Sequence, residues 1–259
     1  MQTLLAPHVF PYLATVVGLV LGSFYNVCVH RYLTGESIVF PGSKCPKCGH
    51  PLSWWENIPL LSYMMLRGKC RSCKAPISLR YPLVELVSGL WALGLALKFG
   101  ASAAWCVYMV LGAIFIIASF IDFASYLLPD ILTLPGAVLA LAGAYFFLHI
   151  PLKDSLIGAA VGAGVFWLLQ WGFKLLKGYD GLGTGDIKLM LLIGALLGWK
   201  GLPVAILAGA LCALLASTYY AMKPKKEGER TMVPFGPFLS LGAMLYILFG
   251  QYYWKYFVS

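Results

Sequence analysis

The sequence predicts an all-α protein that crosses a membrane about eight times and carries one zinc-binding loop domain in the cytoplasm. Of its 259 residues, 60% are hydrophobic and only 11% are charged, whereas a soluble domain carries about 25% charged residues. The apolar runs are about 18–25 residues long and lack strict alternation, which favours helices over the strands of a barrel. The net charge of +9 indicates basic cytoplasmic loops rather than a nucleic-acid partner.

Eight apolar segments are long enough, or nearly so, to be membrane spans. The sixth is short, so it is either tilted or joined to the seventh across a tight turn. Pairs of glycines four residues apart predict close helix packing at 18/22, 158/162 and 194/198. We expect the spans at residues 9–31, 82–99, 102–121, 129–148, 155–176, 187–199, 202–222 and 234–254.

The spans divide the chain into three parts and fix its orientation. The first helix and its flanks occupy residues 1–33, a hydrophilic domain occupies 34–80, and a helical core occupies 81–259. Fifteen of the nineteen lysines and arginines fall on the side that holds residues 34–80. Because basic residues gather on the cytoplasmic side, we expect this domain in the cytoplasm and both termini outside.

Two of the ten acidic residues are candidates for catalysis because they lie at the ends of spans. Asp122 ends the third span, and Asp186 begins the sixth. Two spans lie between them, so both fall on the cytoplasmic face. Neighbouring carboxylates share one proton, which lets one accept a proton from water while the other polarises a peptide carbonyl. Gly183 and Gly185 lack side chains that would keep an extended substrate backbone from Asp186.

Each acid near a span also has a structural interpretation. Asp186 is equally suited to capping the sixth helix, and Asp130 is expected to cap the fourth. Asp180, in a glycine-rich turn, is expected to be a turn residue. Glu85 lies near the cytoplasmic interface, where it pairs with Arg80 or with a neighbouring helix.

Two C-x-x-C pairs in the hydrophilic domain predict a structural zinc site. "CPKC" at 45–48 and "CRSC" at 70–73 each offer two thiolates, and four thiolates close a tetrahedral shell. Disulfides are the alternative, but a cytoplasmic loop keeps its thiols reduced. His50 is a substitute ligand or a surface residue, and Trp54 and Trp55 suit the membrane interface. The predicted ligands are Cys45, Cys48, Cys70 and Cys73.

Four stretches together carry a resemblance to a known family. They are "GSFYNVCVHR" (22–31), "WWENIPLLSYMMLRGKCRSCKAPISLRYPLVEL" (54–86), "IDFASYLLPDILTLP" (121–135) and "GLGTGDIKLMLLIGALLGWKGLP" (181–203). In this order they closely resemble the bacterial type IV prepilin peptidases, which are GxGD-type aspartic proteases of the inner membrane.

The resemblance implies a bifunctional enzyme. The family cleaves the basic leader from prepilins and type II secretion pseudopilins after a glycine, at the cytoplasmic membrane face. It then N-methylates the new terminus with S-adenosylmethionine. The family's catalytic aspartates correspond to Asp122 and Asp186, and its cysteines correspond to the four predicted zinc ligands. The signature often associated with methylation corresponds to Gly22, Ser23, Asn26 and Arg31.

The sequence itself adds three points to this resemblance. It has no Rossmann-like glycine fingerprint, so the methyl donor must be bound in another way. The expected partners are the substrate's apolar helix and membrane lipid. Two other classes remain possible: a transporter or channel, which would place acids near the membrane midplane, and a scaffold that presents a zinc module.

Overall fold

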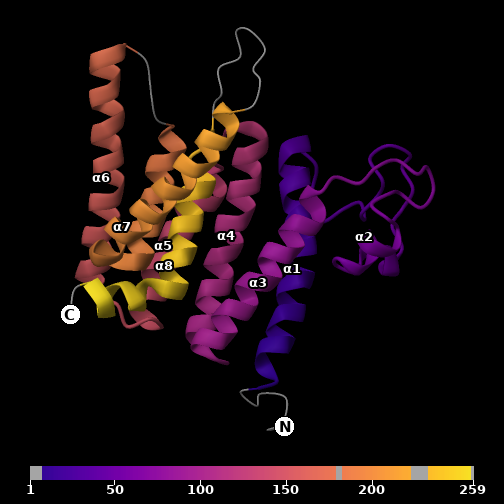
Figure 1. The fold of residues 1–259 in the computed structure, drawn as a ribbon, viewed down its shortest axis with the longest axis horizontal. Coiled ribbons are helices and arrows are strands. Elements are labelled where there is room, and N and C mark those ends of the chain that lie inside the picture. Colours follow the sequence, from indigo (N-terminus) through magenta and orange to yellow (C-terminus); the bar gives the residue numbers. More distant parts are fainter. Residues whose placement is uncertain (1–7, 179–182, 223–232, 258–259) are drawn as a thin grey trace. The chain divides into compact units, whose positions relative to one another are not determined.

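The computed structural model describes residues 8–178, 183–222 and 233–257. The regular elements of these ranges are all helices, with two isolated β-bridges in the cysteine-rich loop, so the predicted all-α class is confirmed (Figure 1). The elements in chain order are α1 (Phe10–Thr34), the 3-10 helix η1 (Trp54–Asn57), α2 (Leu61–Met65), α3 (Arg80–Phe99), α4 (Ala103–Ser125), α5 (Asp130–Phe146), α6 (Leu152–Lys177), α7 (Thr184–Ala221) and α8 (Gly236–Phe257).

The expected count of eight spans is not confirmed. Among the described residues, α1, α3, α4, α6 and α7 are long and apolar enough to cross a membrane, whereas α5 is apolar but has only 17 residues. The sixth and seventh predicted spans are joined in α7, which breaks at Gly198 with φ 67° and ψ 172°. A glycine tolerates this backbone conformation because it has no Cβ.

Residues 1–117 form one compact unit, in which α1 packs along α3. A Cβ added at Gly18 would lie 2.5 Å from the Ser88 carbonyl oxygen, and one at Gly22 would lie 2.7 Å from the Glu85 Cα. The close packing predicted for this glycine pair is therefore confirmed. The Trp91 indole on α3 donates a hydrogen bond to the Tyr108 carbonyl, 3.1 Å away, at the first turns of α4.

Residues 118–259 form the second compact unit, in which α7 contacts α5, α6 and α8. Helices α6 and α7 cross at Gly158 and Gly194, where a Cβ on either glycine would lie within 2.4 Å of the other's carbonyl oxygen. A Cβ at Gly162 would lie 2.7 Å from the Met190 carbonyl oxygen. These predicted contacts are confirmed, and Gly198 both marks the break in α7 and lies close to α6, since a Cβ on Gly158 would lie 2.6 Å from the Gly198 carbonyl carbon.

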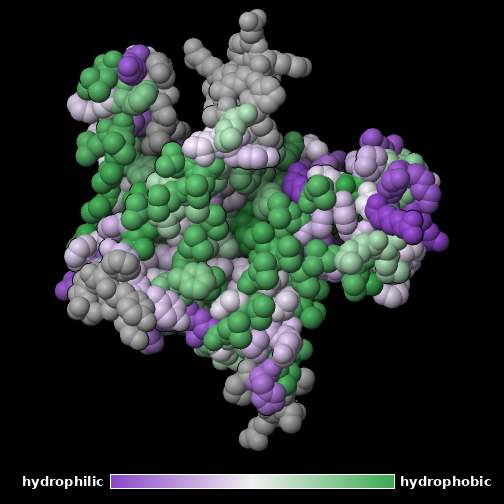
Figure 2. All heavy atoms as spheres, in the orientation of Figure 1, coloured by the Kyte–Doolittle hydropathy of each residue, from purple (hydrophilic) through white to green (hydrophobic). Residues whose placement is uncertain are grey.

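The outer faces of the helices are apolar. Figure 2 shows hydrophobic side chains over the helices, and hydrophilic ones gathered on the loop between α1 and α3. Leucine, valine and phenylalanine are exposed along the helices, as expected for side chains that face lipid rather than water. Multiple apolar helices of this kind make the chain a multi-pass membrane protein.

Candidate active site and metal centre

Asp122 lies one turn before the end of α4 and is buried, with 5% of its surface exposed. The Asp122 carbonyl accepts the Tyr126 N–H at 2.9 Å, where the helix ends. Its carboxylate is within hydrogen-bonding reach of the Gly236 backbone N–H at the first residue of α8. A Cβ on Gly236 would lie 2.7 Å from Asp122 Oδ2. Only a glycine leaves room for the carboxylate at this point.

Asp186 is the third residue of α7 and is also buried, with 9% exposed. Its carboxylate interacts with the backbone N–H of Gly183, which precedes the helix. A carboxylate at the third helical position that reaches back to the preceding N–H resembles half of a capping box. The capping interpretation of Asp186 therefore has structural support, and it fixes the carboxylate close to the helix start.

The two carboxylates lie at the same end of the second unit and interact electrostatically. Leu128, in the link between α4 and α5, lies beside the glycines next to both aspartates. Its side chain would lie 2.8 Å from a Cβ on Gly185 and 3.0 Å from one on Gly236. Two acids that are distant in sequence thus lie close enough to interact, and a carboxylate beside another one ionises less readily than it would alone.

The other acids have separate surroundings. Asp130, expected to be a helix cap, is exposed and forms an ion pair with Lys188, whose Nζ lies 2.6 and 2.7 Å from its two oxygens. Glu85 is buried and accepts the Leu60 N–H at 2.9 Å, whereas Arg80 lies over the Tyr81 ring. Asp180 lies outside the described residues.

The four predicted metal ligands converge in the loop between α1 and α3. Their sulfur atoms all lie within 4.8 Å of one another. Cys45 Sγ is 3.9 Å from Cys73 Sγ, and Cys48 Sγ is 4.0 Å from Cys70 Sγ. These distances exclude disulfides and fit four thiolates about 3.8 Å apart around a zinc ion with Zn–S bonds of about 2.3 Å.

Both C-x-x-C pairs adopt the same hairpin. The Cys45 N–H donates to the His50 carbonyl at 2.9 Å, and the Cys70 N–H donates to the Ala75 carbonyl at 2.8 Å. The residue after each second cysteine has positive φ. The Cys48 backbone N–H lowers the pKa of the Cys45 thiol to about 7. This N–H favours the Cys45 thiolate, the form that binds metal.

His50 is paired with an acid rather than grouped with the cysteines. Its Nε2 lies 3.4 Å from Glu56 Oε2, which also accepts the Ser53 N–H at 2.8 Å. This N–H, helped by His50, holds the pKa of the buried Glu56 carboxyl below its usual value. We therefore replace the metal-ligand role considered for His50 by a structural one, in which its contact with Glu56 shapes the loop.

The methylation signature divides into two pairs. Gly22 packs against α3, and the Asn26 amide donates to the Tyr81 carbonyl at 3.0 Å. Ser23 and Arg31 line a pocket beside the loop. The Arg31 guanidinium donates to the Ser37 and Pro41 carbonyls.

Sequence reasoning missed Gly236 beside Asp122, whose only signal in the sequence was its place at the start of the last span.

The fold and the site define a multi-pass helical membrane protein with paired buried aspartates and a tetracysteine loop. Residues 16–99 match the family model of the bacterial peptidase A24 N-terminal domain, and residues 109–218 match that of the type IV leader peptidase family. The chain belongs to the type IV leader peptidase family.

Curated relatives cover nearly the whole chain. A prepilin leader peptidase/N-methyltransferase of Pseudomonas putida is 38% identical over 267 residues, which is 95% of this chain and 92% of the relative. Proteins of the same name from Burkholderia pseudomallei and Aeromonas salmonicida are 39% and 35% identical, over 92% and 98% of this chain and 84% and 95% of the relatives. No solved structure matches the chain.

Proposed function

We propose that this inner-membrane protein cleaves the leader peptide of type IV prepilins or type II secretion pseudopilins and N-methylates the new terminus. Family membership and the named activity of relatives at 35–39% identity support both reactions. The observation that most directly supports the cleavage reaction is the buried pair Asp122 and Asp186 at one end of the second unit.

Cleavage needs one ionised and one protonated carboxyl group. The ionised aspartate takes a proton from a water molecule, whose oxygen attacks the peptide carbonyl that the protonated aspartate polarises. The carbon–nitrogen bond then breaks, a proton passes to the departing amine, and the pair is left holding one proton again. This reaction uses neither a metal ion nor a covalent intermediate, so the two carboxyl groups suffice.

The substrate lies with its apolar helix among the spans and its basic leader in the cytoplasm. Its cleavage stretch, which ends in a glycine, unwinds and passes the segment from Gly183 to Asp186. Because Asp122 and Asp186 both lie near helix ends, the reaction takes place at one membrane face, which we assign to the cytoplasm. Nothing in the described structure or the relatives supports the transporter alternative, which needs acids near the midplane.

The cysteine loop fits a structural zinc ion, because its four thiols close the coordination shell. The four cysteines would hold the ion, which would fix the shape of residues 45–73, and this loop covers the new terminus during methylation. S-adenosylmethionine supplies a sulfonium-bound methyl group: a carbon–sulfur bond breaks, a bond to the terminal nitrogen forms, and the amine loses a proton. The chain's own contribution is to hold the amine and exclude water.

The proposal is tested by incubating the purified full-length protein with a prepilin, with and without S-adenosylmethionine, and measuring the product terminus by mass spectrometry. We expect cleavage after a glycine in both samples, and a terminus heavier by one methyl group only in the second. An intact prepilin in both samples would overturn the cleavage proposal. A cleaved but never methylated product would overturn the methylation half alone.

A further inference from the structure

A pocket of about 520 Å³ lies between the second half of α1 and the cysteine loop, within the first unit. Its other walls are the segment 38–43, which follows α1, and the residues 54–59 around η1. The volume falls in the range of about 300–1,000 Å³ that is usual for small-molecule sites. Neither the aspartate pair nor the four cysteines line it, so it is separate from the acid pair and from the metal centre.

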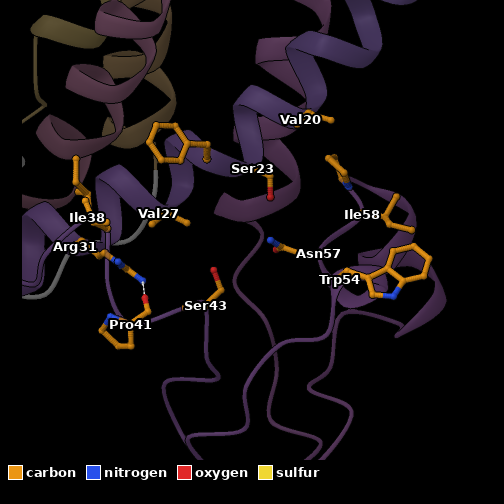
Figure 3. A pocket seen from close by; sticks show the side chains of 14 residues that line it. Val20, Ser23, Val27, Arg31, Ile38, Pro41, Ser43, Trp54, Asn57 and Ile58 are labelled. Atoms are coloured by element: carbon orange, nitrogen blue, oxygen red, sulfur yellow. Dashed lines mark hydrogen bonds between the residues drawn. The ribbon is translucent and has the colours of Figure 1, made fainter.

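The pocket has an apolar end and a polar end. Figure 3 shows Val20 at one end and Arg31, Pro41 and Ser43 at the other. Val20 and Phe24 are about one helical turn apart on α1, and Arg31 lies in the last turn of that helix. The polar end therefore lies at the end of α1 that we assign to the cytoplasmic face, and the apolar end lies deeper in the membrane.

Arg31 is a buried cation at the polar end, with 6% of its surface exposed. Its guanidinium donates to the Ser37 and Pro41 carbonyls, and these two neutral acceptors use only part of its five N–H donors. The described residues that line the pocket include no acidic side chain. Because a buried charge is costly unless an opposite charge neutralises it, the pocket favours an anion.

The buried carboxylate of Glu85, on α3, is directed to other donors. It interacts with the Ser23 hydroxyl and accepts the Leu60 N–H at 2.9 Å, and it does not line the pocket. Ser43 and Asn57 add a hydroxyl and an amide to the pocket wall, and both groups can donate to the oxygens of an anion or an ester.

The apolar surface of the helices continues to the mouth of the pocket. Val16 and Val17 are exposed on α1 about one turn before Val20, and Trp54, which lines the pocket, is 81% exposed. Figures 1 and 2 show hydrophobic side chains of the loop around α2, on the side toward the N-terminal end of α1, and hydrophilic ones on the opposite side. Apolar side chains are costly in water, and tryptophan is typical of the membrane interface. The lipid that covers α1 therefore reaches the pocket.

The charge of the loop favours an anionic lipid over a neutral one. Residues 44–74 carry six lysines and arginines, all exposed, against one acidic residue, Glu56, which is buried. Basic segments beside a membrane attract the anionic lipids of the inner leaflet. A free phosphate would satisfy Arg31 but would leave the apolar end empty, whereas a phospholipid matches both ends.

We propose that this pocket binds one anionic phospholipid of the inner leaflet, with its phosphate at Arg31 and Ser43 and one acyl chain along Val20 and Phe24. The lipid bridges α1 and the cysteine loop, so it fixes the loop at the membrane surface. This inference goes beyond the two proposed reactions and depends on neither of them.

The first test measures the selectivity for lipid charge. Native mass spectrometry of the purified full-length protein, freed of lipid in detergent, gives the dissociation constant of the first bound lipid. The probes are phosphatidylglycerol and phosphatidylcholine with the same acyl chains, which differ in net charge. We expect phosphatidylglycerol to bind at least about tenfold more tightly, because one charge-assisted contact is worth about that factor. Equal affinities would overturn the proposal.

The second test removes the cation. Arg31→Gln should lose the preference for phosphatidylglycerol, while its affinity for phosphatidylcholine stays the same. Lys153→Gln is the matched control, because it removes one positive charge from an exposed residue of α6 outside the pocket, and it should keep the preference. A preference that persists in the Arg31→Gln protein would overturn the assignment of the phosphate.

The third test fills the apolar end and leaves Arg31 in place. Val20 is exposed on α1, so Val20→Trp displaces no core side chain, and it should weaken the binding of both lipids by about tenfold. Val161→Trp, the same change at an exposed position of α6, is the control. Circular dichroism and the melting temperature identify a variant that has failed to fold. If the Val20→Trp and Val161→Trp proteins both bind like the wild type, the proposal is wrong, whatever the fate of the Arg31→Gln protein.

A competition experiment separates a lipid from a soluble anion. Excess inorganic phosphate is added to the protein that holds phosphatidylglycerol. We expect the lipid to stay bound, because phosphate cannot occupy the apolar end. Release of the lipid by phosphate would overturn the lipid proposal and would identify a site for a soluble phosphate at Arg31.

Discussion

At the scale of single residues, the space around Asp122 depends on a glycine. A Cβ on Gly236 would lie 2.7 Å from Asp122 Oδ2 and 3.0 Å from Leu128 Cδ1. Gly236→Ala should therefore displace the carboxylate and reduce kcat/KM for prepilin cleavage by about 100-fold, because small misplacements of reacting groups are that costly. Gly172→Ala on α6, where a Cβ meets open space, is the control. Equal rates in a peptide-release assay would contradict the assignment.

A second residue, Glu56, links pH to the stability of the loop. The Ser53 N–H lowers the pKa of Glu56 below its ordinary value of 4.5. A lowered folded-state pKa stabilises the fold above pH 4.5, and this stabilisation is lost as the pH falls through the folded pKa. Glu56→Gln should speed amide exchange in residues 51–60 at neutral pH, with the difference from wild type shrinking below pH 4.5. The exposed Glu36→Gln serves as the control, and identical exchange at neutral pH would refute the effect.

At the scale of elements, the packing of α6 on α7 depends on backbone contact. A Cβ on Gly194 would lie 2.1 Å from the Gly158 carbonyl oxygen. Gly194→Ala should push the helices apart and cost about 1–3 kcal/mol, as overpacking does. Gly164→Ala, with open space around its Cβ, should cost far less. Denaturation in detergent, followed by circular dichroism, measures both, and equal midpoints would contradict the close crossing.

The cysteine loop should depend on its metal. Replacing Cys45 and Cys48 with serine removes two of the four thiols that converge there, so bound zinc should fall from about one ion per chain to none. Residues 36–79 should then be cut rapidly by trypsin. The matched control replaces Cys106 and Cys212, which lie in helices away from the group. Unchanged zinc by mass spectrometry in the first variant would refute the site.

Local patterns predicted the elements better than their contacts. Each apolar segment lies in a helix, although the sixth and seventh share α7. Hydropathy alone predicted that Asp122 and Asp186 lie on one face, because it sets the number of spans between them. The ion pair of Asp130 with Lys188 was missed, since a cap is judged from neighbours in sequence. The contact of Leu128 with the glycines at 185 and 236 depends on three separate segments, and no local pattern encodes it.

At the scale of the whole molecule, the residues that we propose for the two activities lie in different compact units. The cysteine loop and the methylation signature lie within residues 1–117, and the two aspartates lie within residues 118–259. The two family models follow nearly the same division, at residues 16–99 and 109–218. We therefore expect cleavage and methylation to be separable by substitution, each lost without the other when its own residues are changed.

The most direct measurement is the product mass spectrum of Asp122→Asn and Asp186→Asn proteins given two substrates, an intact prepilin and a pilin already cleaved. We predict that either substitution lowers prepilin cleavage by at least about 100-fold, the usual contribution of acid–base groups, while the cleaved pilin is still methylated. Asp130→Asn, which changes an exposed acid near the same helix ends, should cleave normally. Cleavage at the wild-type rate by either the Asp122→Asn or the Asp186→Asn protein would contradict the account.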